Sequence, residues 1–486
     1  MKENFEKYNA LREQYPVFIY HAYRYEDAPD ELSIVYDFEI PGLAEFHPTW
    51  HFPKGTVHNY VSRDARARLT AASGNATIER MIFYLGMIEL VSYWKTACPK
   101  MVIIEAGRLT EESMAWWKEQ YFYGLGEFFY TNGIALDAEG FMDIRLSEDA
   151  PEIPGVERPI SDGNMRNTHA CMIPIGGGKD SAVALELLCD QKDHNFCYMI
   201  NGRGATFETA AAGGYTDEHI IVAKRTLDPE MLRLNAEGYL NGYTPFSAVV
   251  AFSSILAAYL YGLPYIALSN ESSVKESTGL DGAVDHQYSK SHKFEEDFVE
   301  YERAHVRSGV YYFSLLRPWS QYQIAAKFAS LRKYHKVVRS CNVGSKEDKW
   351  CGHCAKCLYV WMILSPFLSQ ARLTEIFGKN LAEDASLIPI LEELTGLAEE
   401  KPFECVGSQD EVNTAITETI ERLEAGHAGK DAELPVLYQY YKDHALYKEY
   451  QGRPNPYRDY FEEDHDVPPF WAERLDPTHL IYRFEA

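Results

Sequence analysis

Two features that mark membrane and secreted proteins are missing from the sequence. No stretch of about 18 or more apolar residues runs without a charge, so no membrane-spanning helix is expected. The segment Met1–Tyr20 carries Lys, Glu and Arg throughout and has no apolar centre of the kind that signal peptides contain. We therefore expect a cytoplasmic protein with no membrane partner.

Basic residues are also scarce. The chain has 47 Lys and Arg against 72 Asp and Glu, which gives a net charge of −25 at pH 7. A charge of this size repels polyanions over a Debye length unless a local basic patch offsets it, and the Lys and Arg residues are scattered. The composition therefore argues against a nucleic acid partner.

The pattern of apolar residues predicts an α/β protein of more than one domain. A chain of 486 residues is too long for one hydrophobic core. From Ala170 onward, short apolar runs alternate with helical periods, which is typical of a parallel sheet with crossover helices. The expected strands are Cys171–Ile175, Phe196–Ile200, His219–Ala223 and Tyr265–Ser269. The expected divisions are a mixed α+β N-terminal domain over 1–165, a parallel-sheet domain over 166–370 and a mainly helical C-terminal region over 371–486.

A glycine-rich loop follows the first strand of the parallel-sheet domain. The strand ends at Ile175, the run Gly-Gly-Gly-Lys-Asp-Ser occupies 176–181, and helical spacing begins at Ala182. Glycines let successive amide N–H groups point toward one anion, and the helix N-terminus adds positive potential, so the loop suits a pyrophosphate group. The alternative is a plain Gly-rich turn capped by Asp180.

The loop matches neither of two common nucleotide-binding patterns, because the spacing of a Walker A loop and the third glycine of Gly-x-Gly-x-x-Gly are both absent. It resembles the Ser-Gly-Gly-x-Asp-Ser signature of N-type ATP pyrophosphatases, the PP-loop class, with Gly176 in place of the leading Ser. We therefore expect the loop to bind ATP. Gly176, Gly177, Gly178 and Ser181 are assigned to the pyrophosphate, Asp180 to Mg²⁺ or loop closure, and Lys179 to phosphate charge or to solvent.

Four of the nine cysteines form a cluster. Cys341, Cys351, Cys354 and Cys357 supply soft ligands, and the two Cys-x-x-Cys spacings let thiolates meet one ion in tetrahedral geometry. Four protein ligands leave no open position, so the predicted zinc is structural. Disulfides are the rival interpretation, which a cytoplasmic location disfavours. The other five cysteines are expected to be buried thiols.

Several longer stretches of the sequence carry a further resemblance. Together with the glycine-rich loop, they are Gly238–Ser247, Ser269–Ser273, Asp285–Ser291, Tyr312–Pro318, Ser340–Asn342, Trp350–Gly352 and Lys401–Gly407. These stretches resemble the UDP-N-acetyl-α-D-muramoyl-L-alanyl-L-glutamate epimerases of bacterial cell-wall synthesis, and the resemblance runs from about residue 170 to residue 407.

The resemblance implies an activity and its cofactors. The expected reaction converts the terminal L-Glu of UDP-N-acetylmuramoyl-L-Ala-L-Glu to D-Glu through an acyl-adenylate, with ATP and Mg²⁺, and releases AMP and pyrophosphate. The alternative is another PP-loop reaction, an ATP-dependent amide or nitrile formation similar to that of 7-cyano-7-deazaguanine synthase. The sequence leaves the oligomeric state open.

Candidate residues for the chemistry follow the strand Tyr265–Ser269, because ligands in open α/β sheets bind outside the carboxyl ends of strands. His286 is the first candidate for the proton-abstracting base, with Glu271 or Lys290 as its partner across the α-carbon. A hydrogen-bonded structural role is the alternative for each. Candidates for binding the substrate's carboxylates or phosphates are Lys275, Arg225 and Arg317, with ordinary ion pairing as the alternative for the two arginines.

Overall fold

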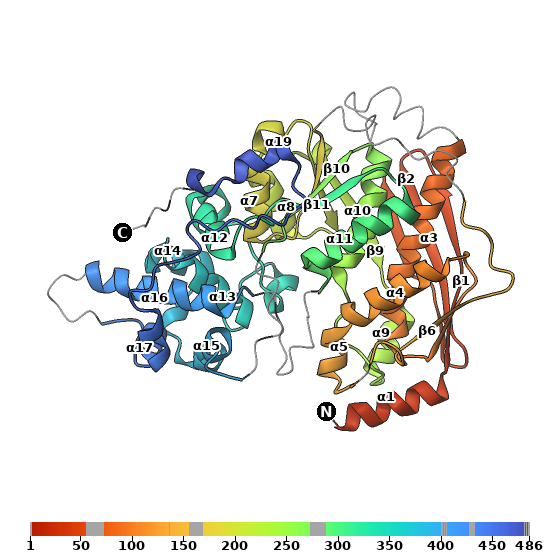
Figure 1. Ribbon diagram of the computed structural model, residues 1–486, viewed down its shortest axis with the longest axis horizontal. Coiled ribbons are helices and arrows are strands. Elements are labelled where there is room, and N and C mark those ends of the chain that lie inside the picture. Colours follow the sequence, from red (N-terminus) through yellow and green to blue (C-terminus); the bar gives the residue numbers. More distant parts are fainter. Residues whose placement is uncertain are drawn as a thin grey trace.

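The computed structural model describes residues 2–54, 72–135, 137–154, 169–272, 288–399, 402, 404, 406–426, 433–480, 482 and 484. Figure 1 shows a sheet that runs from the N-terminal strands on the right toward the centre, and a group of helices on the left. The expectation of a mixed α/β fold is confirmed.

The described strands belong to one sheet of eleven strands, in the order β11-β10-β7-β8-β9-β4-β2-β1-β5-β6, with β3 paired to β2. The N-terminal strands are β1 (Val17–Asp27), β2 (Glu31–Ile40), β3 (Ala44–Phe46), β4 (Thr49–Pro53), β5 (Met101–Ile104) and β6 (Asp143–Leu146). The other strands are β7 (Cys171–Pro174), β8 (Phe196–Ile200), β9 (Ile220–Thr226), β10 (Tyr265–Leu268) and β11 (Tyr311–Ser314).

The half of the sheet from β11 to β9 is parallel and doubly wound. The chain proceeds from β7 to β8 and β9 on one side, and returns to place β10 and β11 on the other side of β7. The order therefore reverses between β7 and β10, which is a topological switch point. The predicted strands β7 to β10 are confirmed, with ends that differ by a few residues.

Both faces of this parallel half are covered. Alternate residues of a strand point to opposite faces: Met172 packs into one hydrophobic core, whereas Cys171 and Ile173 pack into a second core. Strands that are buried on both faces of a sheet have continuous apolar sequences, which is why the sequence pattern predicted these strands.

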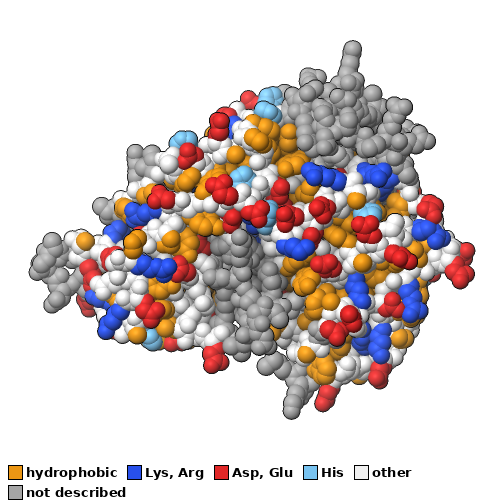
Figure 2. All heavy atoms as spheres, in the orientation of Figure 1, with side chains coloured by type: hydrophobic (Ala, Val, Ile, Leu, Met, Phe, Trp, Pro, Cys, Tyr) orange, Lys and Arg blue, Asp and Glu red, His pale blue; other side chains and the backbone are white. Residues whose placement is uncertain are grey.

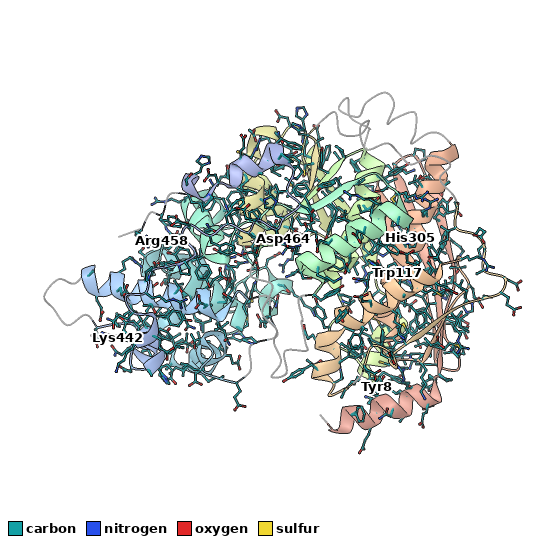
Figure 3. The ribbon with its side chains drawn as sticks, viewed as in Figure 1. Tyr8, Trp117, His305, Lys442, Arg458 and Asp464 are labelled. Atoms are coloured by element: carbon teal, nitrogen blue, oxygen red, sulfur yellow. The ribbon has the colours of Figure 1, made fainter. Side chains whose placement is uncertain are left out.

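The first core contains the N-terminal half of the sheet and the helices on its face. These helices are α3 (Ala72–Trp94), α4 (Glu111–Gly124), α10 (Phe246–Tyr261) and α11 (His292–Tyr301). Trp117 of α4 donates to the Tyr301 hydroxyl at the end of α11, and Tyr301 stacks on His305, so Trp117 and His305 lie close together in Figure 3. Shorter helices of this half are α1 (Lys2–Gln14), α5 (Gly126–Thr131) and α9 (Pro229–Ala236).

The second core joins the opposite face of β7, β8 and β10 to the C-terminal helices. It contains α7 (Lys179–Leu187) and α12 (Gln321–Ser330) together with α13 (Ala355–Leu364) and α16 (Gln409–Gly426), while α8 (Gly204–Ala212) lies beside α7. The remaining helices are α14 (Gln370–Phe377), α15 (Ile388–Thr395), α17 (Val436–Lys442), α18 (Ala445–Tyr450) and α19 (Pro469–Ala472). The expectation of a mainly helical segment after the cysteine cluster agrees with these elements.

One connection joins the two halves of the sheet. β4 pairs antiparallel with β9, with Trp50 opposite Arg225. The sheet therefore continues across residue 165, and the division into domains at 165 and 370 stays a prediction.

The surface of the described residues is mixed in charge. Figure 2 shows Asp and Glu side chains spread over one face with Lys and Arg among them, and no basic stripe. Among the described residues, no helix combines the length and apolar character that crossing a membrane requires.

Of the cysteines outside the cluster, Cys98, Cys171 and Cys197 are buried, but Cys189 is exposed, so the expectation of a buried thiol is wrong there. Cys405 lies outside the described residues.

A buried ion pair holds α3 against the junction of β4 and β9. The Arg225 guanidinium binds both carboxylate oxygens of Glu89, with its Nε at 3.1 and 2.9 Å, and also donates to Ser92 Oγ at 2.9 Å. Glu89 is fully buried and accepts a further hydrogen bond from Trp50 Nε1 at 3.2 Å. The guanidinium and the carboxylate compensate each other's charge, and either charge would be costly to bury alone.

We predict that Arg225→Met lowers the free energy of unfolding by about 3–5 kcal/mol, because it leaves the Glu89 carboxylate buried without its partner. Denaturant unfolding followed by circular dichroism measures the change. Arg233→Met is the control, since Arg233 pairs with Glu230 at the surface and should leave the midpoint unchanged. Equal effects of the two substitutions would contradict the role of the buried pair.

Candidate active site

The glycine-rich loop lies at the switch point of the sheet, between the end of β7 and the start of α7. Gly177 has φ +79°, a left-handed conformation that favours glycine. A Cβ at this position would lie 3.1 Å from Ala205 Cβ and 3.3 Å from the backbone N of Thr206, so the loop also packs tightly against α8. At Gly176, by contrast, a Cβ would meet no atom within 4 Å, so the site has room for the Ser that the PP-loop signature carries there.

The side chains after the glycines turn back toward the loop. Ser181 Oγ accepts a hydrogen bond from the Gly176 amide at 3.2 Å. Lys179 is buried, and its ammonium group donates to Asp180 Oδ1 at 2.7 Å and to Gln321 Oε1 at the start of α12. The interpretation of Lys179 as a solvent-exposed side chain is therefore wrong, because its ammonium is held inside the site.

Asp180 carries a negative charge at neutral pH. Burial alone would raise the pKa of its carboxyl, but the positive charges of Lys179, Lys356 and Lys290 outweigh burial and hold the pKa below the usual value. A charged carboxylate beside an anion-binding loop is the type of ligand that Mg²⁺ prefers. The residues present therefore fit the Mg²⁺ that the sequence predicts.

Glu271 lies three residues after the end of β10, so the second side of the switch point supplies a buried carboxyl group. Burial, and then the charges of Glu411, Glu271 and Asp180, raise the pKa of Tyr359 on α13, so these three carboxyl groups act on the same phenol. Lys290 contributes to the low pKa of Asp180, so its ammonium group lies near the same place. The structure thus brings together Asp180, Glu271 and Lys290.

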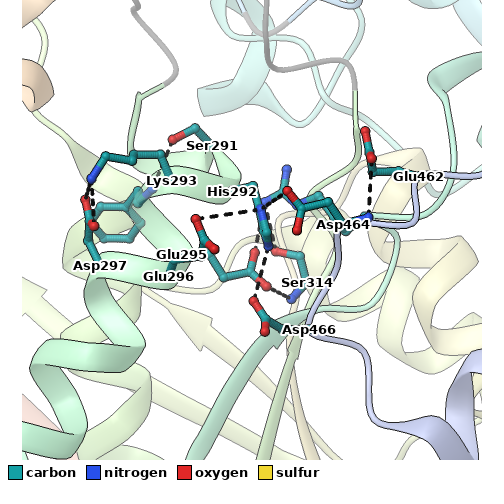
Figure 4. Close-up of polar contacts among 12 residues, drawn as sticks. Ser291, His292, Lys293, Glu295, Glu296, Asp297, Ser314, Glu462, Asp464 and Asp466 are labelled. Atoms are coloured by element: carbon teal, nitrogen blue, oxygen red, sulfur yellow. Dashed lines mark hydrogen bonds and ion pairs between the residues drawn. The ribbon is translucent and has the colours of Figure 1, made fainter.

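Arg317 holds the backbone of this region in place. Its guanidinium donates to the carbonyl oxygen of Glu271 at 2.6 Å, to the carbonyl oxygen of Lys290 at 2.8 Å and to Glu295 Oε2 at 2.9 Å. Glu295 in turn accepts from the Ser314 amide at 2.7 Å, as Figure 4 shows. The ion pair is almost fully buried. Arg317 therefore positions two of the predicted catalytic residues, and its role in binding the substrate stays a prediction.

The other predicted substrate-binding and catalytic residues are placed differently. Arg225 lies on β9, and its guanidinium binds Glu89 and Ser92 of α3. It is therefore not among the groups that surround Asp180, and its role as a ligand of the substrate stays a prediction. His286 and Lys275 lie outside the described residues.

Four residues of this region were not singled out from the sequence: Gln321, Lys356, Tyr359 and Glu411. Both Lys356 and Tyr359 lie on α13: Lys356 stands between Cys354 and Cys357, and Tyr359 is two residues beyond Cys357. This closeness to the cysteine cluster was the one signal in the sequence that could have indicated them.

The four cysteines converge as the spacing predicts. Their sulfur atoms lie within 4.8 Å of one another, with Sγ–Sγ distances of 3.9 Å for Cys341–Cys354, 3.7 Å for Cys351–Cys357 and 3.6 Å for Cys354–Cys357. A tetrahedral Zn²⁺ with Zn–S bonds of about 2.3 Å separates its sulfur ligands by about 3.8 Å. The described residues therefore fit a zinc ion, which would cross-link the segment 341–351 to the N-terminus of α13.

The segment from Arg339 to Asp348, which contains the first of these cysteines, also contacts the glycine-rich loop and α8. The Arg339 amide donates to the Gly177 carbonyl at 2.8 Å. Asp348, with φ +49°, accepts from the amides of Gly204 and Ala205 at 2.9 and 3.0 Å, so its carboxylate caps the N-terminus of α8. The amides at the start of α8 are thus satisfied within the protein.

A second group of possible metal ligands lies at the N-terminus of α11. His292 Nδ1 is 3.4 Å from Asp464 and 4.0 Å from Glu296, and His292 Nε2 is 3.2 Å from Asp466, as Figure 4 shows. The two ring nitrogens face different carboxylates, and Asp464 is exposed. The arrangement fits a contact that holds the C-terminal segment against α11.

The structure is an α/β fold with a glycine-rich loop and buried carboxyl groups at the switch point of its sheet. Comparison with known families identifies it further: the sequence matches the MurL N-terminal domain over residues 9–315 and the MurL C-terminal domain over residues 337–432. The chain belongs to the family of UDP-N-acetyl-α-D-muramoyl-L-alanyl-L-glutamate epimerases.

Two relatives illustrate the match. The epimerase of that name from Xanthomonas oryzae pv. oryzae is 33% identical over 367 residues, which cover 74% of this chain and 78% of the relative. The epimerase from Salinispora tropica is 33% identical over 348 residues, which cover 70% of this chain and 73% of the relative. No solved structure matches the chain. The resemblance that the sequence motifs indicated is confirmed.

We predict that the purified, reduced protein contains about one zinc ion per chain, because the four sulfur atoms form a complete tetrahedral site. Cys357→Ser should lose the metal and lower the melting temperature, since the cross-link to α13 is removed. Metal analysis by mass spectrometry measures the content. Cys189→Ser is the control, because Cys189 is exposed and lies away from the cluster, and it should retain the metal. Zinc-free wild-type protein would contradict the prediction.

Proposed function

We propose that the protein uses ATP to epimerise the terminal L-Glu of UDP-N-acetylmuramoyl-L-Ala-L-Glu to D-Glu through an acyl-adenylate, releasing AMP and pyrophosphate. The names of the relatives support the epimerase and the muramoyl dipeptide substrate. One structural observation carries the ATP-dependent part: the glycine-rich loop after β7 and the buried Glu271 after β10 lie on the two sides of one switch point. Assignment of this half of the chain to the PP-loop class belongs to the same proposal.

Adenylation provides a physical reason for joining ATP to an epimerase. The α-hydrogen of a carboxylate is hardly acidic, because its removal would place a second negative charge beside the first. When the carboxylate oxygen attacks the α-phosphorus of ATP, pyrophosphate leaves and the carboxyl charge is removed. The α-hydrogen of the resulting acyl-adenylate can then be taken by a base, and a proton can be returned to the opposite face. Water finally hydrolyses the mixed anhydride to AMP and the D-Glu carboxylate.

The residues of the loop would bind the leaving pyrophosphate. The amides of Gly177 and Gly178 and of the first turn of α7 would donate to the anion, while Ser181, whose Oγ accepts from the Gly176 amide, would add a hydroxyl donor. Mg²⁺, held by Asp180, would neutralise phosphate charge. Lys290 and Lys356 lie close enough to lower the pKa of Asp180, so they supply positive charge to the same place.

The proton transfers need two groups, one on each face of the α-carbon. Glu271 and Lys290 are held by Arg317 through their carbonyl oxygens, which fixes their positions relative to the loop. His286, the first candidate for the base, belongs to the segment between these two residues in the sequence. Zinc, held by the four cysteines, would contribute a cross-link and no chemistry, because it has no open position.

The alternative, an amide-forming or nitrile-forming reaction on a deazapurine, would use the same loop and cysteine cluster. No observation in the described residues favours it. The names of the relatives favour the epimerase.

We predict that Asp180→Asn lowers AMP release in the presence of ATP and the nucleotide dipeptide by about 10²-fold, because a charged ligand of a catalytic metal contributes several kcal/mol to transition-state stabilisation. Chromatography of the nucleotides measures AMP. Asp217→Asn is the matched control, since Asp217 is an exposed acid of the same sheet half and should release AMP normally. Normal AMP release by a folded Asp180→Asn variant would remove the loop from the mechanism.

We also predict that exchange of the substrate's α-hydrogen with heavy water depends on ATP, because only the adenylate is acidic enough. An ATP analogue blocked at the α,β bridge should support no exchange. His286→Gln should still release pyrophosphate but should incorporate deuterium more slowly by about 10²- to 10⁴-fold. Mass spectrometry of the recovered dipeptide measures the deuterium. Exchange without ATP would refute activation by adenylation, and normal exchange in His286→Gln would move the base to Glu271 or Lys290.

A further inference from the structure

The segment that joins β11 to α12 contacts both sides of the switch point. On the side of β10, Arg317 donates to a carbonyl oxygen of the following loop, and the Trp319 carbonyl accepts from the amide and the hydroxyl of Ser272, each at 3.2 Å. On the side of β7, Gln321 Oε1 accepts a hydrogen bond from the ammonium group of Lys179. Gln321 is the first residue of α12 and Lys179 is the first residue of α7, so this bond links the two helix starts.

Protein encloses the Lys179 ammonium group. The residue is 3% exposed, and its Nζ donates to Asp180 Oδ1 at 2.7 Å and to Gln321 Oε1. An ammonium group has three donors and no acceptor, so the amide of Gln321 must turn its oxygen toward it. A buried charge is costly unless it is both paired and hydrogen-bonded. Asp180 supplies the opposite charge, and Gln321 supplies a second hydrogen bond.

Packing of α12 against α7 does not depend on this hydrogen bond. Apolar residues of both helices, among them Ala182 and Leu185 of α7 and Ile324 and Ala325 of α12, belong to the second hydrophobic core. These contacts hold the two helices together without a polar partner for Lys179. The effect of Gln321 is therefore on the ammonium group itself.

The two acceptors of Lys179 differ in what a metal ion does to them. In the proposed function Asp180 gives its carboxylate to Mg²⁺, so one carboxylate would serve two cations. Two cations beside one carboxylate repel each other, and each is then bound less strongly. The amide oxygen of Gln321 is neutral and belongs to another helix, so it still accepts from the ammonium group when Asp180 binds a metal ion.

We propose that Gln321 is a positioning residue, which holds the Lys179 ammonium group in place so that Asp180 can bind Mg²⁺ without leaving a buried charge unsatisfied. The inference rests on the proposed function, in which Asp180 is the ligand of Mg²⁺ and the loop binds pyrophosphate. Gln321 acts only through Lys179 and Asp180. Lys179 then stays beside the loop as a fixed positive charge.

The test is the affinity of the full-length protein for Mg²⁺ at a saturating concentration of an ATP analogue blocked at the α,β bridge. Isothermal titration calorimetry measures it, and because the analogue is not cleaved, the readout is binding and not turnover. Gln321→Met keeps most of the side-chain volume but removes the acceptor. The dissociation constant for Mg²⁺ should rise by about tenfold, a typical loss for a hydrogen bond to a charged group.

A double-mutant cycle separates this effect from a general disturbance of α12. Lys179→Met removes the ammonium group, so in that background Gln321→Met should cause no further change in the dissociation constant for Mg²⁺. Gln321→Glu keeps an acceptor for the ammonium group and should bind Mg²⁺ at least as tightly as the wild type. If Gln321→Met does not fold, Gln321→Ala removes the same acceptor and takes its place in the cycle.

Gln191→Met is the matched control. Gln191 Oε1 also accepts a hydrogen bond, from Trp471 Nε1 at 3.1 Å, but it lies beyond the opposite end of α7. Its substitution removes an acceptor of the same kind and should leave the dissociation constant for Mg²⁺ at the wild-type value.

An unchanged dissociation constant in the folded Gln321→Met variant would overturn the inference. So would an equal rise in the wild-type and Lys179→Met backgrounds, or an equal rise in Gln191→Met. Each of these results leaves the proposed function standing, because the wild-type protein would still bind Mg²⁺ with the analogue. Absence of Mg²⁺-dependent binding of the analogue by the wild type would instead overturn the ATP-dependent part of the proposed function, and this inference with it.

Discussion

The parallel pairing of β7 with β10 is the constraint on which the site depends. The register sets Tyr265 opposite Cys171 and Ile266 opposite Met172, so the two strands end at the same edge of the sheet. After β7 the chain leaves toward β8, and after β10 it leaves toward β11, so the two connections run in opposite directions from this edge. Ligands of open α/β sheets bind at such a switch point. Because hydrophobic cores cover both faces of the sheet, this edge is where loops can carry polar groups.

Two further features hold the segments around this switch point in place. Arg317 binds the carbonyl oxygens on both sides of the segment 272–289, and its charge is balanced by Glu295. A buried ion pair contributes little net stability compared with apolar packing, so its effect here is to specify geometry. The cysteine cluster is the second feature. A bound zinc would fix the start of α13, which carries Lys356 and Tyr359, against the segment that contacts the loop.

Local patterns in the sequence were sufficient for the features that depend on local structure. The apolar runs predicted β7 to β10, the glycines predicted a loop between a strand and a helix, and the Cys-x-x-Cys spacing predicted the convergence of four sulfur atoms. The pairing of β4 with β9 could not be predicted, because it joins segments more than 170 residues apart that have no shared pattern. The ion pair of Arg225 with Glu89 could not be predicted either, because only the tertiary structure brings α3 to β9. Glu411 was missed because Ser408-x-x-Glu411 is, in sequence, only a helix start.

The charge of the chain then has two different consequences. The net charge of −25 opposes the approach of large polyanions, whose charges extend across many Debye lengths of surface. The small nucleotide of the proposed reaction would respond mainly to groups within a few ångströms, because solvent and salt screen the more distant acids. Around Asp180 the positive groups outnumber the negative one, because the charges of Lys179, Lys290 and Lys356 all lower the pKa of its carboxyl. The acidic chain and the local group of lysines therefore do not conflict, and the proposed binding of a small nucleotide requires this combination.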